Sequence, residues 1–229
     1  MFSLGEARKN EYVWCCMIWL KSLFSSGTLQ RGDTITIVCD PQTAKHLRAS
    51  TLIRVAGVQL HEVPAPADCR QGMNLKYMYR PKTEDVVVYM DSDQILRKPF
   101  RPDIPPDTLL CYPEGPISDT NYRGDYPYTE GPGFTAGIWA YRRGVRVDEW
   151  LDAVLKRCAE SEKKFYCLDQ PHFNAVIREL APPLQMLKRE AVSFNGHGNV
   201  QEAFVLNLAG DPGDGALHFQ KMLDMMLLL

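Results

Sequence analysis

An uninterrupted apolar run, Val86–Met90, ends directly in the acidic triplet Asp91-Ser92-Asp93. The run lacks polar alternation, which is typical of a strand buried on both faces of a parallel sheet. Strand-like and helix-like segments alternate through the first hundred residues, as in a sheet built from βα units. The sequence therefore predicts an α/β fold with a mostly parallel central sheet flanked by helices.

The remaining elements follow from hydrophobic periodicity and from Pro and Gly breaks. Predicted helices cover residues 12–24, 74–79, 147–161 and 169–180, with a further one opening at Pro41, and the first is apolar on nearly every face. Predicted strands cover residues 2–4, 34–38, 58–63, 108–112 and 134–141. Residues 102–133 are otherwise rich in Pro, Gly, Asp and Tyr, which favours a long functional loop.

The length of 229 residues suits a single domain over the whole chain. The formal net charge is -2 and the pI is about 6.2, so no basic surface for nucleic acid is expected. Residues 13–20 and 222–229 are apolar but too short to span a bilayer. The second segment either packs as a last helix or belongs to a chain that continues in a longer protein; the sequence leaves both open.

The chain has seven cysteines, an odd number without a CxxC pair, and several lie within apolar runs. This usage favours buried, reduced thiols over a disulfide framework or a zinc site. A reducing compartment follows, so the predicted location is cytoplasmic.

The acidic triplet places Asp91 and Asp93 one residue apart at the end of a strand, where ligands of open α/β sheets collect. Mg²⁺ and Mn²⁺ are commonly held by one or two carboxylates together with substrate phosphates. Two carboxylates would repel a diphosphate unless a cation lay between them. The alternative is that both residues only close the strand in a turn.

Four blocks then follow one another along the chain: Tyr89-Met90-Asp91-Ser92-Asp93, Phe134-Thr135-Ala136-Gly137-Ile138-Trp139, Leu168-Asp169-Gln170-Pro171-His172-Phe173-Asn174 and Leu217-His218-Phe219. Their order and spacing resemble the GT-A glycosyltransferases, most closely glycosyltransferase family 8, which includes glycogenin and bacterial lipopolysaccharide galactosyltransferases. The resemblance covers residues 12–221 approximately.

The resemblance implies a GT-A fold with a nucleotide-binding part over about residues 1–100 and an acceptor part over about 101–221. Mn²⁺, or Mg²⁺, would be bound by Asp91, Asp93 and His218. The donor, a UDP-sugar, would be bound by residues that read its base and ribose or contact its diphosphate and sugar: Leu4, Glu6, Tyr12, Ser92, Lys76, Ala136, Gly137 and Lys221.

The implied reaction moves a hexose-type sugar from the nucleotide to a hydroxyl acceptor, such as a glycan or protein-linked glycan, with retention at the anomeric carbon. Asp169 and Gln170 would orient the donor sugar and stabilise the transition state electrostatically. If transfer inverts instead, Asp119, Asp125 and Glu130 are the candidates for a general base.

The chain departs from the family pattern at two positions. Thr135 stands where the family has Asn, and Lys221 stands where the late block has Gly. Lys76 could equally be a solvated helix charge, and an isolated histidine such as His218 is often structural. The roles given to Lys76, His218 and Lys221 therefore rest on the resemblance alone.

Two other functions remain open from the sequence. A sugar-phosphate nucleotidyltransferase would share the sheet, the metal and the nucleotide, but usually has a Gly-rich basic loop of which Gly5-Glu6-Ala7-Arg8-Lys9 is a faint version. A non-catalytic sugar-nucleotide-binding module would bind the donor without turnover. A haloacid-dehalogenase phosphohydrolase is disfavoured by Ile95, because that family expects Thr or Val at this point.

Overall fold

A computed structural model describes residues 6–81, 85–116, 131–144, 146–162, 169–195, 200–208 and 215–228. The chain forms two compact units: unit 1 is Met1–Leu75, Asp91–Pro102 and Glu190–Leu229, and unit 2 is Lys76–Met90 and Asp103–Arg189. The units interleave along the chain, so their limits do not coincide with a division near residue 100. That the chain is one domain stays a prediction, and the predicted strand 2–4 lies outside the described residues.

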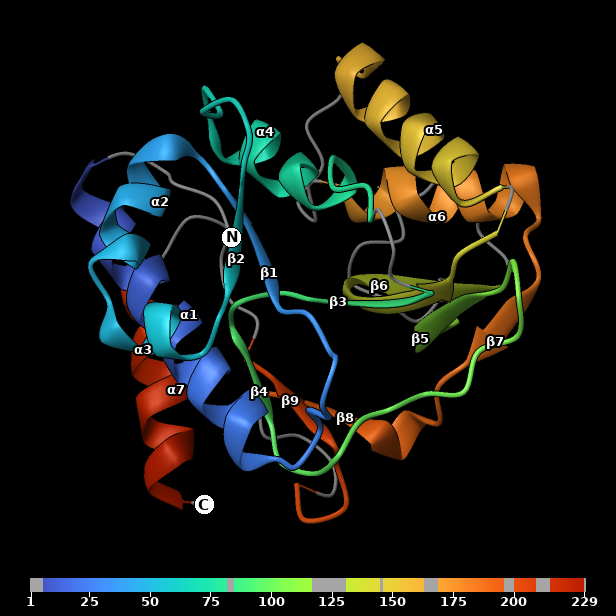
Figure 1. Ribbon diagram of the computed structural model, residues 1–229. Coiled ribbons are helices and arrows are strands. Elements are labelled where there is room, and N and C mark those ends of the chain that lie inside the picture. Colours follow the sequence, from blue (N-terminus) through green and yellow to red (C-terminus); the bar gives the residue numbers. More distant parts are fainter. Residues whose placement is uncertain are drawn as a thin grey trace. The chain divides into compact units, whose positions relative to one another are not determined.

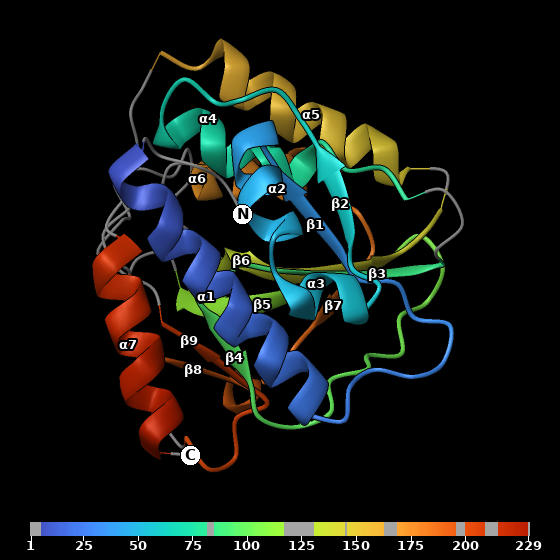
Figure 2. The ribbon, with the colours of Figure 1, turned by 60° about the vertical axis from the view of Figure 1, so that its left-hand side comes forward.

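Unit 1 contains two small sheets and several helices. The helices are α1 (Glu6–Ser25), α2 (Pro41–Arg48), α3 (Thr51–Val55), α4 (Cys69–Asn74) and α7 (Gly215–Leu228). One sheet pairs β1 (Thr36–Cys39) with β2 (Gln59–Glu62) in parallel; the other has the order β4 (Gln94–Leu96), β9 (Val205–Asn207), β8 (Val192–Phe194). Helices α1 and α7 lie side by side in both views (Figures 1 and 2).

The core of unit 1 joins α1 and α7 to the sheet of β4, β9 and β8. Cys15 of α1 and Met222 of α7 pack with Ile95 and Leu206 in one buried cluster. Trp14, one residue before Cys15, is 56% exposed, so α1 is buried on one side and not all around. The cluster therefore fixes α7 against the start of β4, where the acidic triplet ends.

Unit 2 is one mixed sheet covered by helices. Its strands are β3 (Val86–Met90), β5 (Leu109–Pro116), β6 (Pro132–Arg142) and β7 (Leu184–Met186), in the order β3-β6-β5-β7. Its helices are α5 (Val147–Glu160), α6 (Gln170–Leu180) and most of the 3-10 turn η1 (Leu75–Tyr77). Helices α5 and α6 cover one face of the sheet (Figure 1).

The α/β class and the flanking helices are confirmed, but the strand pairing differs from the expected parallel sheet. β3 is an edge strand antiparallel to β6, and β5 is also antiparallel to β6. Val87 and Tyr89 pack on the core of unit 2, whereas Val88 is 37% exposed. The run is therefore buried on one face, and its lack of polar residues does not indicate a strand buried on both sides.

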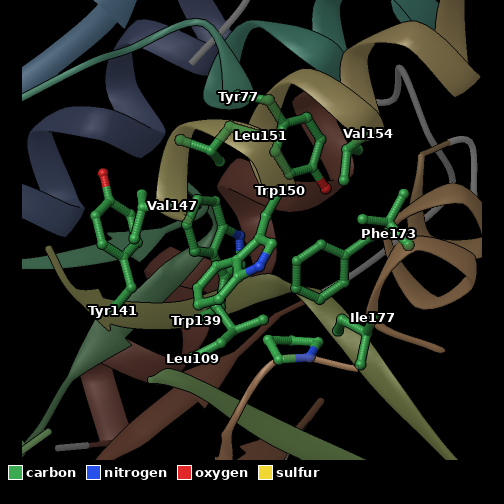
Figure 3. A pocket seen from close by; sticks show the side chains of 12 residues that line it. Tyr77, Leu109, Trp139, Tyr141, Val147, Trp150, Leu151, Val154, Phe173 and Ile177 are labelled. Carbon is green, nitrogen blue, oxygen red and sulfur yellow. The ribbon is translucent and has the colours of Figure 1, made fainter. Parts of the chain in front are cut away.

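Aromatic side chains fill the space between the sheet of unit 2 and its helices. Tyr77, Trp139, Trp150 and Phe173 surround a small apolar cavity (Figure 3), whose volume of about 20 Å³ leaves room for about one water molecule. Trp139 is stacked on both Tyr77 and Tyr89. This close packing fixes η1 and the first turn of α6 relative to β6.

The expectation of reduced thiols holds for the described cysteines. Cys15, Cys16, Cys39, Cys111 and Cys158 are all buried and free. Burial raises the pKa of the Cys15 thiol to about 12, with Asp93 as the next cause. Among the residues placed here, no helix is long and apolar enough to cross a membrane.

Asp40 caps α2, and its contacts generate a stability prediction. Its buried carboxylate accepts from the backbone N–H groups of Gln42 (2.9 Å) and Thr43 (3.1 Å) and from the Thr43 hydroxyl (2.6 Å). Asp40→Ala removes all three bonds, so the free energy of unfolding should fall by about 2 kcal/mol in urea titrations.

Asp68→Ala is the matched control, because Asp68 caps the six-residue helix α4 through one exposed bond from Gln71 N. It should lower the free energy of unfolding by no more than about 0.5–1 kcal/mol. Equal losses for the two variants would contradict the importance given to the buried cap.

Candidate active site

Asp93 and His218 meet in unit 1. Asp93 follows β3 in the turn before β4, and its carbonyl accepts from Leu208 N at 3.0 Å. His218 lies on the first turn of α7, and its Nδ1 is 2.9 Å from Asp93 Oδ2. Because α7 packs on the core beneath β4, two residues far apart in the sequence come into contact as the family resemblance implies.

The Asp93–His218 pair has a spacing that suits two ligands of one divalent cation. Adjacent ligands at about 2.1 Å from an octahedral ion lie about 3 Å apart, which matches the nitrogen–oxygen distance. The second carboxylate oxygen, Asp93 Oδ1, is buried and has no hydrogen-bond partner among the described residues. Both observations fit a cation at this carboxylate, and carboxylate with imidazole is an acceptable donor set for Mn²⁺.

Asp91 does not complete a three-residue cluster. It is half-buried, and nowhere in the described ranges do three His, Cys, Asp or Glu side chains lie close enough to hold a metal ion together. The structure thus brings together two of the three proposed ligands, Asp93 and His218. Asp91 as a ligand stays a prediction.

The other predicted donor-binding residues of unit 1 differ in burial and in their distance from the Asp93–His218 pair. Tyr12 is buried on α1, with its ring centroid 6.1 Å from that of His218. Ser92 is half-buried in the turn, and Lys221 Nζ lies 3.4 Å from Asn195 Oδ1. Leu4 lies outside the described residues, and for Glu6 only its place at the start of α1 is described. Tyr12 is therefore in ring contact with His218, while Ser92 adjoins Asp93 along the chain and Lys221 follows His218 on α7.

In unit 2, Lys76 and Asp169 form a buried ion pair. Lys76 Nζ is 3.0 Å from Asp169 Oδ2, and both side chains are at most 3% exposed. The Tyr77 hydroxyl donates to the same oxygen at 2.5 Å, and burial, followed by this carboxylate, holds the Tyr77 pKa well above its usual value. The interpretation of Lys76 as a solvated helix charge is therefore wrong.

Ala136 of β6 lies between this ion pair and Gln170. Its carbonyl accepts from Lys76 Nζ at 3.0 Å, and its N–H donates to Gln170 Oε1 at 3.1 Å. In the β5–β6 register, the residues between Phe134 and Trp139 are skipped, which leaves the Ala136 backbone available to side chains. The predicted residues Lys76, Ala136, Asp169 and Gln170 thus form one connected network.

Asn174 completes the attachment of α6 to β6. Its side chain accepts from Phe134 N at 2.8 Å and donates to Phe134 O at 2.7 Å. Asp169 occupies the N-cap position of α6, but its side chain makes no capping bond. The ion pair and these side-chain bonds, more than the helix dipole, therefore hold the Asp169-Gln170 pair in place.

Glu114 is a member of this network that the sequence did not reveal. Gln170 Nε2 donates to Glu114 Oε2 at 2.9 Å. Burial raises the Glu114 pKa to about 7, while hydrogen bonds from Gln170 and Thr135 act in the opposite direction. Glu114 lies in a Pro/Gly-rich stretch that matches no motif, so only its place in space identifies it.

Comparison with known proteins establishes the fold. No family model and no curated protein sequence matches the chain. Among solved structures, it is similar to the galactosyltransferase LgtC in complex with donor and acceptor sugar analogs, with TM-score 0.62 and 11% identity over 94% of this chain and 93% of that one.

Two further glycosyltransferase structures are also similar to this chain in fold. Mouse xyloside xylosyltransferase 1 has TM-score 0.53 and 12% identity, over 89% of this chain and 94% of that one. GlyE of Streptococcus pneumoniae TIGR4 has TM-score 0.58 and 14% identity, over 93% of this chain and 57% of that one. The chain therefore has the GT-A glycosyltransferase fold, as the motif order predicts.

The buried ion pair gives a prediction on stability. Lys76→Met leaves Asp169 buried without its cation, so the free energy of unfolding should fall by about 3 kcal/mol or more in chemical denaturation. The double variant Lys76→Met/Asp169→Leu removes both charges and should recover most of that loss.

Lys156→Met is the control, because Lys156 pairs with Glu160 at the exposed surface of α5. It should change the free energy of unfolding by less than about 0.5 kcal/mol. If Lys76→Met were equally mild, the pair would not be the buried interaction described here.

Proposed function

We propose that this protein is a metal-dependent glycosyltransferase that moves a hexose-type sugar from a UDP-sugar to a glycan or other hydroxyl acceptor, with retention. The observation that carries the proposal is the contact between Asp93 and His218, two residues that the family resemblance implies as ligands of one metal ion. The GT-A fold shared with solved glycosyltransferases is consistent with it. The buried, free thiols among the described residues support the cytoplasmic location that we also propose.

In unit 1, Asp93 and His218 would hold Mn²⁺ or Mg²⁺, with Asp91 as a third ligand. When bound, the cation neutralises the diphosphate and so stabilises the charge that develops on the leaving nucleotide. Tyr12, whose ring contacts that of His218, is the proposed residue for contact with the base or ribose. Lys221 is a further positive charge on α7 that could contact a phosphate oxygen.

In unit 2, the proposal assigns the donor sugar to Gln170 and Asp169. The Gln170 amide has N–H donors and a carbonyl oxygen, which are groups that can hydrogen-bond sugar hydroxyls. Asp169 is fixed by Lys76 and Tyr77, and a fixed negative charge stabilises a cation-like anomeric carbon.

The first test of the function is binding. With Mn²⁺ present, one or a few UDP-sugars from a panel should raise the melting temperature by several degrees, because a ligand that binds only the folded state stabilises it. Chelation with EDTA should abolish the shift. Asp93→Asn and His218→Ala should each weaken it, with apparent metal affinity lowered about ten-fold or more.

His46→Ala, an exposed histidine on α2, is the control and should leave the shift unchanged. UDP binding of equal affinity with chelator and with Mn²⁺ would refute the metal-bridged donor. If the protein binds a UDP-sugar but releases no UDP with any acceptor supplied, a non-catalytic binding module is favoured. If it releases pyrophosphate from UTP and a sugar phosphate, a nucleotidyltransferase is favoured.

The stereochemistry of transfer gives a second test. Proton NMR of the product should show the same anomeric configuration as the donor, because the departing diphosphate can itself take the proton of the acceptor. An inverted product would overturn this assignment. A general base would then be sought among Asp119, Asp125 and Glu130, all outside the described residues.

A further inference from the structure

Glu114 is a carboxylate brought to the Gln170 amide by an irregular strand. The β5–β6 register shifts twice, between Cys111 and Pro113 and again between Pro113 and Gly115, so Glu114 lies inside a bulged segment. Bulges beside active sites commonly redirect one side chain. The irregularity of β5 thus accompanies a specific contact, Gln170 Nε2 to Glu114 Oε2 at 2.9 Å.

The backbone on either side of Glu114 is held in one conformation by Gly115 and by contacts of Arg189. Gly115 has φ +122°, which L side chains rarely adopt, and a Cβ there would lie 2.9 Å from the Arg189 guanidinium. Arg189 Nη2 in turn donates to the Glu114 carbonyl at 3.4 Å, and the Arg189 carbonyl accepts from the Tyr112 hydroxyl at 3.0 Å. Glycine at 115 is therefore required for the conformation that presents Glu114.

The Gln170 side chain is held from both ends. Its Oε1 accepts from Ala136 N at 3.1 Å and its Nε2 donates to Glu114. The first bond fixes which end of the amide is the oxygen, and the second prevents rotation of the amide plane. Removing the Glu114 contact would take away the bond at Gln170 Nε2 and keep the bond at Oε1.

We propose that Glu114 is a positioning residue for the transfer reaction, whose carboxylate locks the Gln170 amide in the orientation used to hold the donor sugar. This inference rests on the proposed function, because it assumes that Gln170 contacts the donor. It adds a residue from the middle segment of the chain to a site previously defined by the four motif blocks.

The groups that face Glu114 determine how its bond to the Gln170 amide, here called the lock, depends on pH. They are Thr135 from β6, Gln170 from α6 and, at its main chain, Arg189 from the turn after β7. An ionised carboxylate accepts from both Gln170 and Thr135, and bonds to a charged acceptor are roughly twice as strong as neutral ones. Since the Glu114 pKa is raised to about 7, protonation below that pH weakens the lock.

The test is the pH profile of kcat for wild type and Glu114→Gln. Wild-type kcat should rise with pH through about 7 and level off above it. Glu114→Gln keeps the shape and an acceptor oxygen but no charge, so the acidic limb should disappear and kcat at pH 8 should fall about ten-fold with little change in donor KM. Glu149→Gln, an exposed carboxylate on α5, should retain the wild-type profile.

NMR of the Gln170 side-chain amide separates this inference from the proposed function. Its signals should move with a midpoint near pH 7 in wild type and stay constant in Glu114→Gln, whether or not a sugar is transferred. An amide that does not titrate, or an acidic limb that persists in Glu114→Gln, overturns the positioning role. Absence of transfer with every UDP-sugar, alongside a titrating amide, would refute the function and leave the lock intact.

Discussion

The buried ion pair between Lys76 and Asp169 is the interaction on which unit 2 depends. A charge removed from water is costly unless it is paired and hydrogen-bonded, and Asp169 is both paired with Lys76 and hydrogen-bonded by Tyr77. These contacts require η1 and the first turn of α6 to keep a fixed separation. Because Lys76 also binds the Ala136 carbonyl, β6 is held to the same geometry.

The aromatic packing beneath this pair explains how the geometry is maintained. Tyr77 belongs to the core through its ring and to the polar network through its hydroxyl, with Trp139 stacked on one part and Asp169 bonded to the other. Any shift of η1 would disturb both. Such rigidity suits the role in donor-sugar positioning proposed for this site, since small displacements in reacting groups lower rates strongly.

The sequence predicted the parts of the molecule that follow from local pattern. The helix over residues 169–180 and the helix that opens at Pro41 depend on short-range periodicity and agree with the structure. The fold that the order of the four blocks implies agrees with the glycosyltransferase neighbours. The prediction that Val86–Met90 is a parallel strand buried on both faces is wrong, because an apolar run is equally compatible with an edge strand that packs on one face.

The contact of Glu114 and the burial of Lys76 could not be predicted from the sequence, because they depend on which elements become neighbours in the fold. Glu114 has no motif around it and acquires its contact with Gln170 only through the bulged register of β5 on β6. Lys76 could be placed on a short helix, but its burial follows from the position of Asp169, far along the chain. Long-range pairing of this kind is not encoded in any single segment.

In unit 1, the proposed cation would lie at Asp93 and His218, which are in contact in the structure. Asp93 has one oxygen directed to His218 and one buried without a partner among the described residues. Anomalous diffraction at the manganese edge, from crystals grown with Mn²⁺ and UDP, tests this most directly. The account predicts a peak within bonding distance of the Asp93 carboxylate and the His218 imidazole; a fully bound UDP with no manganese at these two side chains would contradict it.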